Sequence, residues 1–258
     1  LAAQSFVDKS FFSPVYTSNV NALGVIRILE AIRHFSEKTK FYQASSSEMY
    51  GNVKSKTQDE KTNFQPVSPY AVSKLHAHWM LNLYRDAYKL YCCSGILFNH
   101  DSPLRGNQFV TQKIIRDLVK IKLKKLNTLE LGNIYARRDW GYSKDYVEAM
   151  WKMLQQKKAQ DYVISSGHTF TVKDFINKAA INLDFKIKWT GKGLNERAIN
   201  TSNNRVIVRI QKNLFRPTEV ANTFGDHSKA KKILKWKPKT NFSELVEIMC
   251  EAELAKYR

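Results

Sequence analysis

The stretches KFYQASSSE, residues 40–48, and SPYAVSK, residues 68–74, decide which fold this chain is expected to adopt. The first begins as a short strand-like run and ends in serines and a glutamate. The second begins with a serine and a proline, which are typical of the residue before a helix and of its first position. Helical patterns and short apolar strands continue to alternate along the chain, which is typical of an α/β protein with a parallel sheet. Because ligands bind beyond the carboxyl ends of parallel strands, the polar residues after the first strand are candidates for a site.

Tyr70 and Lys74 lie four residues apart in the opening turns of the predicted helix, and therefore on one face of it. A nearby ammonium favours the ionised form of a phenol, whose unperturbed pKa is about 10. We therefore expect Lys74 to lower the pKa of Tyr70 towards neutral pH, and Lys74 is also suited to hydrogen-bond a ribose. The spacing alone is weak evidence, because Tyr50 and Lys54 repeat it in a predicted turn. The serines before Glu48 are, by themselves, typical of an ordinary turn.

The combination of Ser46, Tyr70 and Lys74 resembles the extended short-chain dehydrogenase/reductases, in which a Ser or Thr and a Tyr-x-x-x-Lys motif hold the nicotinamide and move a proton with a hydride. Glu48, two residues after the serine, is similar to the acidic residue of the nucleotide-sugar 4,6-dehydratases. The likeness to those dehydratases that act on GDP-mannose covers nearly the whole chain. It rests on the segments LAAQS (1–5), FYQASSSEMYG (41–51), SPYAVSK (68–74), GILFNH (95–100), RDWG (138–141), DYVEAMW (145–151) and RPTEV (216–220).

The resemblance implies an α/β fold: a Rossmann-like, doubly wound parallel sheet, incomplete at its N-terminus, with a smaller α/β substrate-binding lobe. Residues 1–106 are expected to form the C-terminal part of the NADP-binding domain, with the catalytic Ser, Glu, Tyr and Lys. Residues 107–258 are expected to form mainly the substrate lobe, with some segments returning to the first domain.

The resemblance also implies a reaction, the conversion of GDP-mannose to GDP-4-keto-6-deoxy-mannose. Ionised Tyr70 takes the C4 hydroxyl proton while NADP receives the C4 hydride, and Ser46 hydrogen-bonds the developing carbonyl. Glu48 removes the C5 proton and assists loss of the C6 hydroxyl as water, after which the hydride returns to C6. Lys74 completes the catalytic set.

Two groups of binding residues follow from the same resemblance. The NADP-binding residues are expected to be Leu1, Ala2, Ala3, Gln4, Ser5, Tyr16, Lys74, His100 and Arg105. The substrate-binding residues are expected to be Ser47, Asn99, Val110, Lys113, Arg138, Arg216 and Glu219, and no metal is expected. The planar fork of an arginine suits a diphosphate, so Arg138 and Arg216 are expected to bind the GDP pyrophosphate. From composition alone, these arginines are typical of surface ion pairs and Tyr16 of an aromatic packed at a helix start.

Three departures from the family pattern concern phosphate binding. Leu104 and Gln112 stand where the family usually has Arg. None of the ten glycines forms a G-x-x-G-x-x-G or G-x-G-x-x-G turn. The chain begins abruptly in what resembles the end of a fourth strand, so we expect that its glycine-rich opening is missing and that the chain as given is inactive.

Periodicity predicts the remaining elements. A helix is expected over residues 14–35, with Val20, Leu23, Ile26, Leu29 and Ile32 towards the sheet. A second long helix is expected over residues 70–88, with Leu75, Trp79, Leu83 and Ala87 on its apolar side. Further helices are expected at residues 108–125, 144–156, 172–183 and 242–256, strands at 40–44, 91–98, 128–131 and 161–165, and a loop at 137–140.

The net charge of +19 raises the possibility of a nucleic-acid partner, but lysine-rich helices are more often solvated faces, so nucleic acid is not expected. No apolar run is long enough to span a membrane, and the first residues lack a signal-peptide pattern. Three cysteines without metal-ligand spacing fit a reducing compartment. We expect a cytoplasmic protein that forms a homo-oligomer, a dimer or tetramer, when complete.

Two alternatives remain from the sequence. A dehydratase for another nucleotide-sugar or an epimerase would share most of the motif, although simple C4 epimerisation needs no base at Glu48. A catalytically inactive binding or scaffold relative would explain the absent glycine-rich turn and the positive charge.

Overall fold

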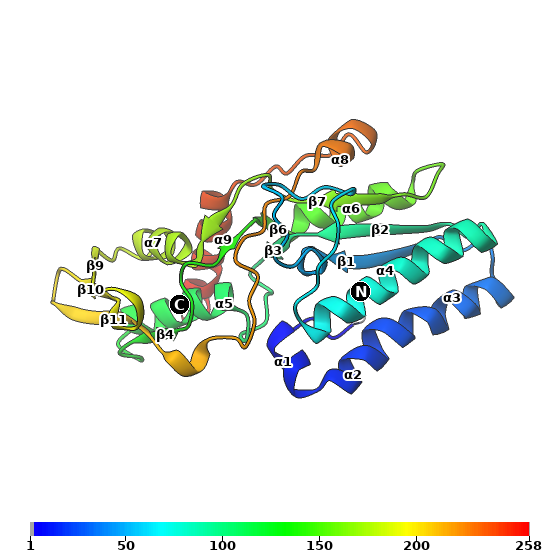
Figure 1. The fold of residues 1–258 in the computed structure, drawn as a ribbon. Helices are drawn as coiled ribbons and strands as arrows, with labels where there is room; N and C mark the ends of the chain where they lie inside the picture. The colour runs from blue at the N-terminus through cyan, green and yellow to red at the C-terminus, as the bar shows by residue number, and fades with distance from the viewer. Residues whose placement is uncertain (1–2, 258) are drawn as a thin grey trace.

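The first layer of the molecule is a three-stranded parallel sheet. The computed structural model describes residues 3–257, so the predicted NADP contacts Leu1 and Ala2 lie outside the described residues. The strands β1 (Phe41–Ser46), β2 (Cys92–Leu97) and β7 (Asp161–Ile164) lie in the order β1-β2-β7, in the registers Ser46↔Leu97 and Leu97↔Ile164 (Figure 1). Their carboxyl ends therefore meet at one edge, as the alternating pattern predicts. The α/β fold is confirmed.

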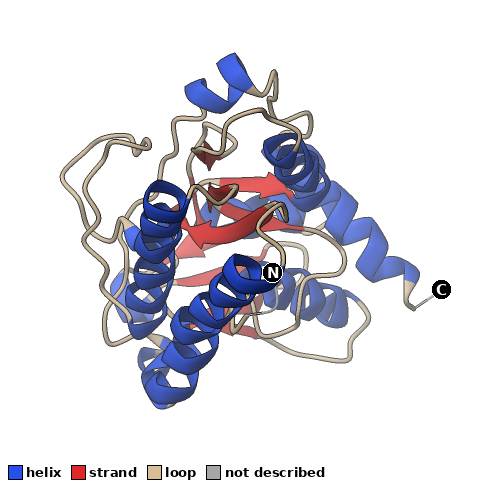
Figure 2. Cartoon of the chain, turned by 90° about the vertical axis from the view of Figure 1, so that its right-hand side faces the viewer, coloured by secondary structure: helices blue, strands red, loops and turns tan. Residues whose placement is uncertain are grey.

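Helices cover both faces of this sheet (Figure 2). The helices α3 (Gly24–Phe35) and α4 (Pro69–Tyr88) pack on one face, and α6 (Ser143–Leu154) and α8 (Ser228–Ile233) on the other. Cys92 packs in the first of these apolar clusters and Cys93 in the second, because adjacent strand residues point to opposite faces.

The predicted helix over residues 14–35 is present, but its buried face differs from the prediction. It runs as α2 (Pro14–Ser18), a π-helical turn (Asn19–Leu23) and α3, after the short helix α1 (Val7–Phe12). Val25, Leu29 and Ile32 are buried, whereas Leu23 is exposed. The π-helical turn holds an additional residue, so it rotates the residues before it relative to those after it.

Helix α4 begins as predicted and buries a different side. The Ser68 hydroxyl accepts a hydrogen bond from the Ala71 N–H at 3.1 Å, and Pro69 takes the first helical position. Trp79 and Leu83 were predicted to be apolar-side residues, yet they are 57% and 52% exposed. A row of residues four apart drifts around a helix of 3.6 residues per turn, so it cannot stay on one narrow face. The buried row combines three- and four-residue steps and contains Tyr70, Lys74, Ala77, Leu81 and Tyr84.

The second layer is built on a four-stranded sheet with the order β4-β11-β10-β9. Its strands are β4 (Leu129–Leu131), β11 (Arg205–Ile210), β10 (Arg197–Asn200) and β9 (Ile187–Thr190); β4 and β11 are parallel and the other pairs antiparallel. The helices α5 (Val110–Lys122), α7 (Val172–Asn182) and α9 (Phe242–Ala255) pack around one apolar core with β4, β10 and β11. The helices and β4 were predicted, whereas β9, β10, β11 and α8 were not.

The predicted loop at residues 137–140 is wrong, because it contributes to two short strand pairs. β5 (Arg137–Arg138) pairs with β8 (Phe170–Thr171), and β6 (Trp140–Tyr142) pairs in parallel with β3 (Asn99–Asp101). These pairs join the two layers, since β3 follows β2 directly. Two loops add a second link, in which the Gln58 N–H donates to the Phe224 carbonyl at 2.8 Å and the Asp226 N–H to the Gln58 carbonyl at 2.9 Å.

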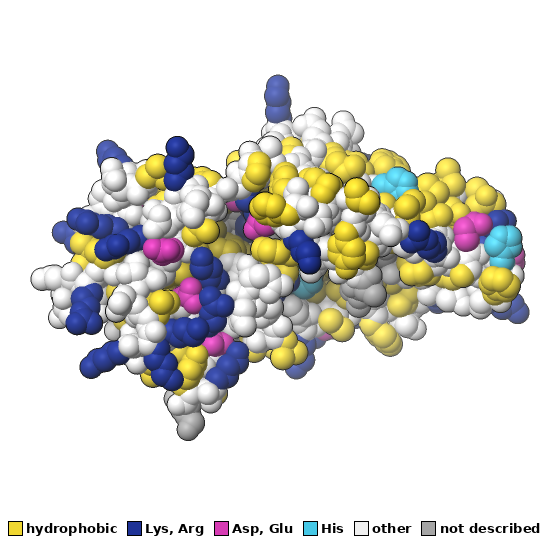
Figure 3. Space-filling view, turned by 90° about the horizontal axis from the view of Figure 1, so that it is seen from below, with side chains coloured by type: hydrophobic (Ala, Val, Ile, Leu, Met, Phe, Trp, Pro, Cys, Tyr) yellow, Lys and Arg dark blue, Asp and Glu magenta, His cyan; other side chains and the backbone are white. Residues whose placement is uncertain are grey.

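The surface charge is divided unevenly between the two layers. Residues 1–106 hold 12 Lys and Arg against 8 Asp and Glu, a net +4, and residues 107–258 hold 30 against 15, a net +15. Figure 3 shows the basic side chains gathered over the second layer and hydrophobic ones over the first. Within residues 3–257, no helix has the length and apolarity needed to cross a membrane. That same range contains no cluster of His, Cys, Asp and Glu able to hold a metal.

Candidate active site

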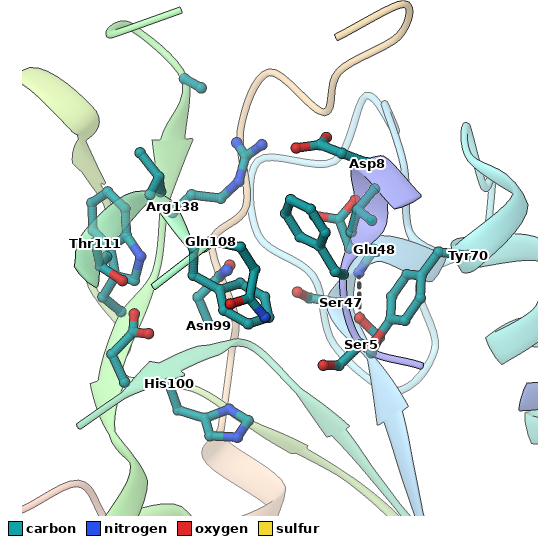
Figure 4. A pocket seen from close by; sticks show the side chains of 18 of the residues that line it. Ser5, Asp8, Ser47, Glu48, Tyr70, Asn99, His100, Gln108, Thr111 and Arg138 are labelled. Atoms are coloured by element: carbon teal, nitrogen blue, oxygen red, sulfur yellow. Dashed lines mark hydrogen bonds between the residues drawn. The ribbon is translucent and has the colours of Figure 1, made fainter. Parts of the chain in front are cut away.

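A cavity of about 490 Å³ opens at the carboxyl ends of β1 and β2, between the two layers. Most predicted site residues that the structure describes line it (Figure 4). They are Ala3, Ser5, Ser46, Ser47, Glu48, Tyr70, Lys74, Asn99, His100, Arg105, Val110, Lys113, Arg138, Arg216 and Glu219. Residues distant in the sequence therefore converge on one space.

Ser46 and Glu48 come from the end of β1. The Ser46 hydroxyl accepts a hydrogen bond from the Glu48 N–H at 3.2 Å and so caps a short 3-10 helix, Ser47–Met49. Ser46 and Glu48 therefore form an ordinary capped turn, as serines often do, and they also line the cavity. The turn brings Glu48 to the cavity, where Figure 4 shows it close to Ser47 and Tyr70.

Tyr70 and Lys74 lie on the buried side of α4, with 8% and 5% of their surface exposed. The Lys74 ammonium donates to the Ala44 carbonyl at 3.0 Å, and its nitrogen is 5.8 Å from the centre of the Tyr70 ring. Burial raises the pKa of Tyr70 to about 12, although the Ser46 hydroxyl acts in the opposite direction. Burial also lowers the pKa of Lys74 to about 8. The predicted lowering of the Tyr70 pKa is therefore wrong for this structure, because burial has the largest effect on the phenol and raises its pKa.

His100 lies in β3, and Arg105 lies in the loop that follows this strand. His100 Nδ1 is 2.9 Å from the Phe98 carbonyl oxygen, and its ring stacks on Tyr146 with 4.7 Å between centroids. Arg105 lies 2.8 Å from the buried Asp101 carboxylate, and its guanidinium is 3.5 Å from the centre of the Phe109 ring. Both side chains are held in place by their own neighbours.

Arg138 is fixed by main-chain oxygens. Its Nη1 donates to the Val220 carbonyl at 2.7 Å and to the Arg137 carbonyl at 2.9 Å, and its Nη2 lies 3.5 Å from Glu219. Burial lowers the pKa of Arg138, and the charges of Glu48 and Glu219 oppose that effect.

The next residue, Asp139, holds the turn that follows β7. Its carboxylate accepts hydrogen bonds from the Ser166 N–H at 2.7 Å and the Gly167 N–H at 3.0 Å. Burial nevertheless raises the pKa of Asp139 to about 6. Asp139 therefore ties the segment that carries Arg138 to the residues after β7.

Two residues on the opposite wall have simpler contacts. The Lys113 ammonium donates to the Glu130 carbonyl at 2.6 Å. Arg216 lies after a 3-10 turn, Lys212–Leu214, and its Nε is 2.5 Å from Asp8 Oδ1. The sequence analysis did not identify Asp8 as a site residue. No motif marks it, because its ion-pair partner, Arg216, is about 200 residues away in the chain.

Two predicted cofactor contacts do not line the cavity. Gln4 donates from its side chain to the Phe6 carbonyl at 2.6 Å, and its backbone exchanges hydrogen bonds with Asn21. Tyr16 is exposed on α2, where the Lys9 ammonium is 5.8 Å from its ring centre.

The predicted cofactor contacts that do line the cavity, among them Lys74, Ala3 and Ser5, fit the nicotinamide and ribose end of a dinucleotide. Lys74 is buried but has one hydrogen-bond partner within residues 3–257, the Ala44 carbonyl, so donors remain for a polar ligand. Ala3 and Ser5 line the same cavity as Lys74.

The family model for GDP-mannose 4,6 dehydratase matches residues 1–249. The chain belongs to this family. It is 48% identical to the GDP-mannose 4,6 dehydratase of Drosophila melanogaster, over 100% of this chain and 66% of the relative. It is 45% identical to that of Homo sapiens, over 100% of this chain and 70% of the relative.

Solved structures agree with the fold that this family implies. The RMD structure from Pseudomonas aeruginosa complexed with NADPH superimposes with a TM-score of 0.83 at 22% identity, over 99% of this chain and 80% of that one. The DesIV structure, a dTDP-glucose 4,6-dehydratase from Streptomyces venezuelae, gives 0.82 at 20% identity, over 98% and 71%. At these identities the solved structures support only the extended short-chain dehydrogenase/reductase fold. The assignment to the family rests on the family model and on the more similar relatives.

Proposed function

We propose that this chain carries the active site of a GDP-mannose 4,6-dehydratase, the activity for which its relatives are named. The observation that carries the proposal is that Ser46, Glu48, Tyr70 and Lys74 line one cavity together with Arg138 and Arg216. We also propose that residues 1–106, with β7 returning to them, form the cofactor side, and that most of the later residues form the substrate side.

Each residue has a distinct task in the proposed reaction. The Tyr70 phenolate takes the proton from the C4 hydroxyl, and the Ser46 hydroxyl donates to the carbonyl oxygen that forms. Bound NADP would supply a positively charged hydride acceptor for C4, which would favour ionised Tyr70, and in its reduced form it would supply the hydride for C6. The ketone makes the C5 proton acidic, so the Glu48 carboxylate removes it and then protonates the departing C6 hydroxyl, which leaves as water. Lys74 hydrogen-bonds the cofactor ribose.

The substrate side can be tested by titrating GDP into the chain of residues 1–258. Arg216→Lys keeps the charge but loses the two-pronged hydrogen bonding, so we expect about tenfold weaker GDP binding and unchanged guanosine binding. Arg138→Lys should act in the same direction, with thermal unfolding as a control because Arg138 also holds main-chain carbonyls. Equal GDP affinity in the wild type and both variants would remove these arginines from the site.

We further propose that the protein forms a homodimer through α3 and α4. These helices lie side by side, joined by the hydrogen bond from the Tyr84 hydroxyl to Glu30 at 2.6 Å. Both expose apolar side chains, namely Ile28 on α3 and Val72, Trp79 and Leu83 on α4, and Leu23 is exposed at the end of the π-helical turn before α3. A twofold axis across two adjacent helices covers both stripes with the same surface of a second copy.

Sedimentation velocity tests this interface. Trp79→Lys should shift a dimer to a monomer, because it places a charge in an apolar contact. Trp151→Lys, at an exposed tryptophan of α6, is the matched control and should leave the dimer intact. A wild-type monomer, or a dimer that persists in Trp79→Lys, contradicts the proposal.

A further inference from the structure

Three arginines line the cavity, Arg105, Arg138 and Arg216, and the first two are held in place by neighbouring groups. Arg138 is 6% exposed and bonded to two main-chain carbonyls, and Arg105 is joined to a buried carboxylate and lies over an aromatic ring. Their orientations are therefore set by the surrounding protein.

Arg216 is held differently. Its Nε lies 2.5 Å from Asp8 Oδ1, with the arginine side chain 26% and the aspartate side chain 37% exposed. Arg216 makes no other ion pair or side-chain hydrogen bond with residues 3–257. Asp8 lies on α1 of the first layer, whereas Arg216 lies in the second layer, so the ion pair spans the cavity. Figure 4 shows the Asp8 carboxylate turned towards the side from which Arg138 enters.

A guanidinium binds a carboxylate and a phosphate through the same N–H edges. We propose that Asp8 competes with the diphosphate of the ligand for Arg216 and thereby lowers the affinity of the cavity for nucleoside diphosphates. This inference rests on the proposed function of Arg216. A diphosphate must either displace Asp8 or lie close to its negative charge, and both alternatives weaken binding.

The size of the effect follows from the exposure of the pair. Partly exposed ion pairs are weak and are screened by salt, so a dianionic diphosphate can displace a single carboxylate. Removing the Asp8 charge should therefore tighten GDP binding by about threefold to tenfold at low ionic strength. Ligands that have no phosphate do not form an ion pair with Arg216, so removal of the Asp8 charge should not change their affinity.

Calorimetric titration of GDP into residues 1–258 tests the proposal. Asp8→Asn keeps the size of the side chain and removes its charge, and it should bind GDP about threefold to tenfold more tightly than the wild type, with guanosine unchanged. Asp8→Ala should tighten GDP binding by a similar factor. This second variant tests whether the gain comes from the loss of the charge and not from the asparagine itself. Asp86→Asn, an exposed aspartate of α4 outside the cavity, is the matched charge control and should bind GDP as the wild type does.

The competition requires Arg216, which gives a second test. In an Arg216→Ala background, Asp8→Asn should give little or no gain in GDP affinity. A full gain in that background would assign the effect to general electrostatics and overturn the competition. Unchanged or weaker GDP binding in Asp8→Asn would overturn it too, and weaker binding would make Asp8 a residue that orients Arg216.

The two proposals fail in different ways. If the wild type binds no GDP, the proposed function and this inference both fall. If the wild type binds GDP and Arg216→Lys weakens it, while Asp8→Asn changes nothing, only the inference about Asp8 falls.

Discussion

Glu48 and Tyr70 line the same cavity from different elements, and in the proposed reaction each has a task that the other cannot perform. Oxidation at C4 needs a group that accepts the hydroxyl proton, and Tyr70 is protonated once it has done so. Removal of the C5 proton then needs a second base within about 3 Å of it. We propose that this second base is Glu48, which the turn after β1 brings to the cavity.

This division of tasks predicts different defects in two variants of an enzyme completed with the glycine-rich segment of a relative. Glu48→Gln keeps the shape and removes the base, so it should form some NADPH from GDP-mannose but release at least about a hundredfold less 6-deoxy product. Exchange of the C5 hydrogen in heavy water should be lost as well. Tyr70→Phe should instead form no NADPH. Exchange and product formation near wild-type rates in Glu48→Gln would show that Glu48 is not the base.

At the scale of the elements, local signals predicted where α4 begins but not which side of it is buried. Ser68 and Pro69 mark the start of the helix by capping chemistry, which depends on the nearest few residues. The buried side depends instead on what α4 packs against, namely α3 and the first sheet. Trp79 and Leu83 are large and apolar yet lie outside this contact. Residue type alone therefore cannot identify the buried side of a helix that has apolar residues on two sides.

The strands of the second sheet show the same limit. Residues 187–210 mix apolar residues with Lys, Arg and Asn, and their longest continuous apolar run is three residues, 206–208. Their pairing also includes a bulge between Ala198 and Ile199, which breaks the two-residue period. The ion pair between Asp8 and Arg216 lay beyond prediction for another reason, since it exists only after the two layers pack together.

At the scale of the whole molecule, the two halves of the cavity differ in what this chain provides. The proposed substrate half has Arg138 and Arg216 and a second layer with a net charge of +15 over residues 107–258, from 30 basic and 15 acidic residues. Such a charge raises the local concentration of anionic ligands by long-range attraction that salt screens. The proposed cofactor half offers Lys74, Ala3 and Ser5 as lining residues.

A polypeptide of residues 1–258 should therefore bind GDP but bind NADP poorly and show no detectable turnover. Pyrophosphate binding in Rossmann folds depends on a glycine-rich turn whose backbone N–H groups and helix N-terminus face the phosphates. None of the ten glycines in residues 1–258 forms such a turn. Calorimetric titration of NADP, with GDP titrated into the same preparation as a control for folding, measures the difference. Micromolar NADP affinity would contradict the prediction, because it would mean that the residues around Lys74 hold a dinucleotide without a phosphate cradle.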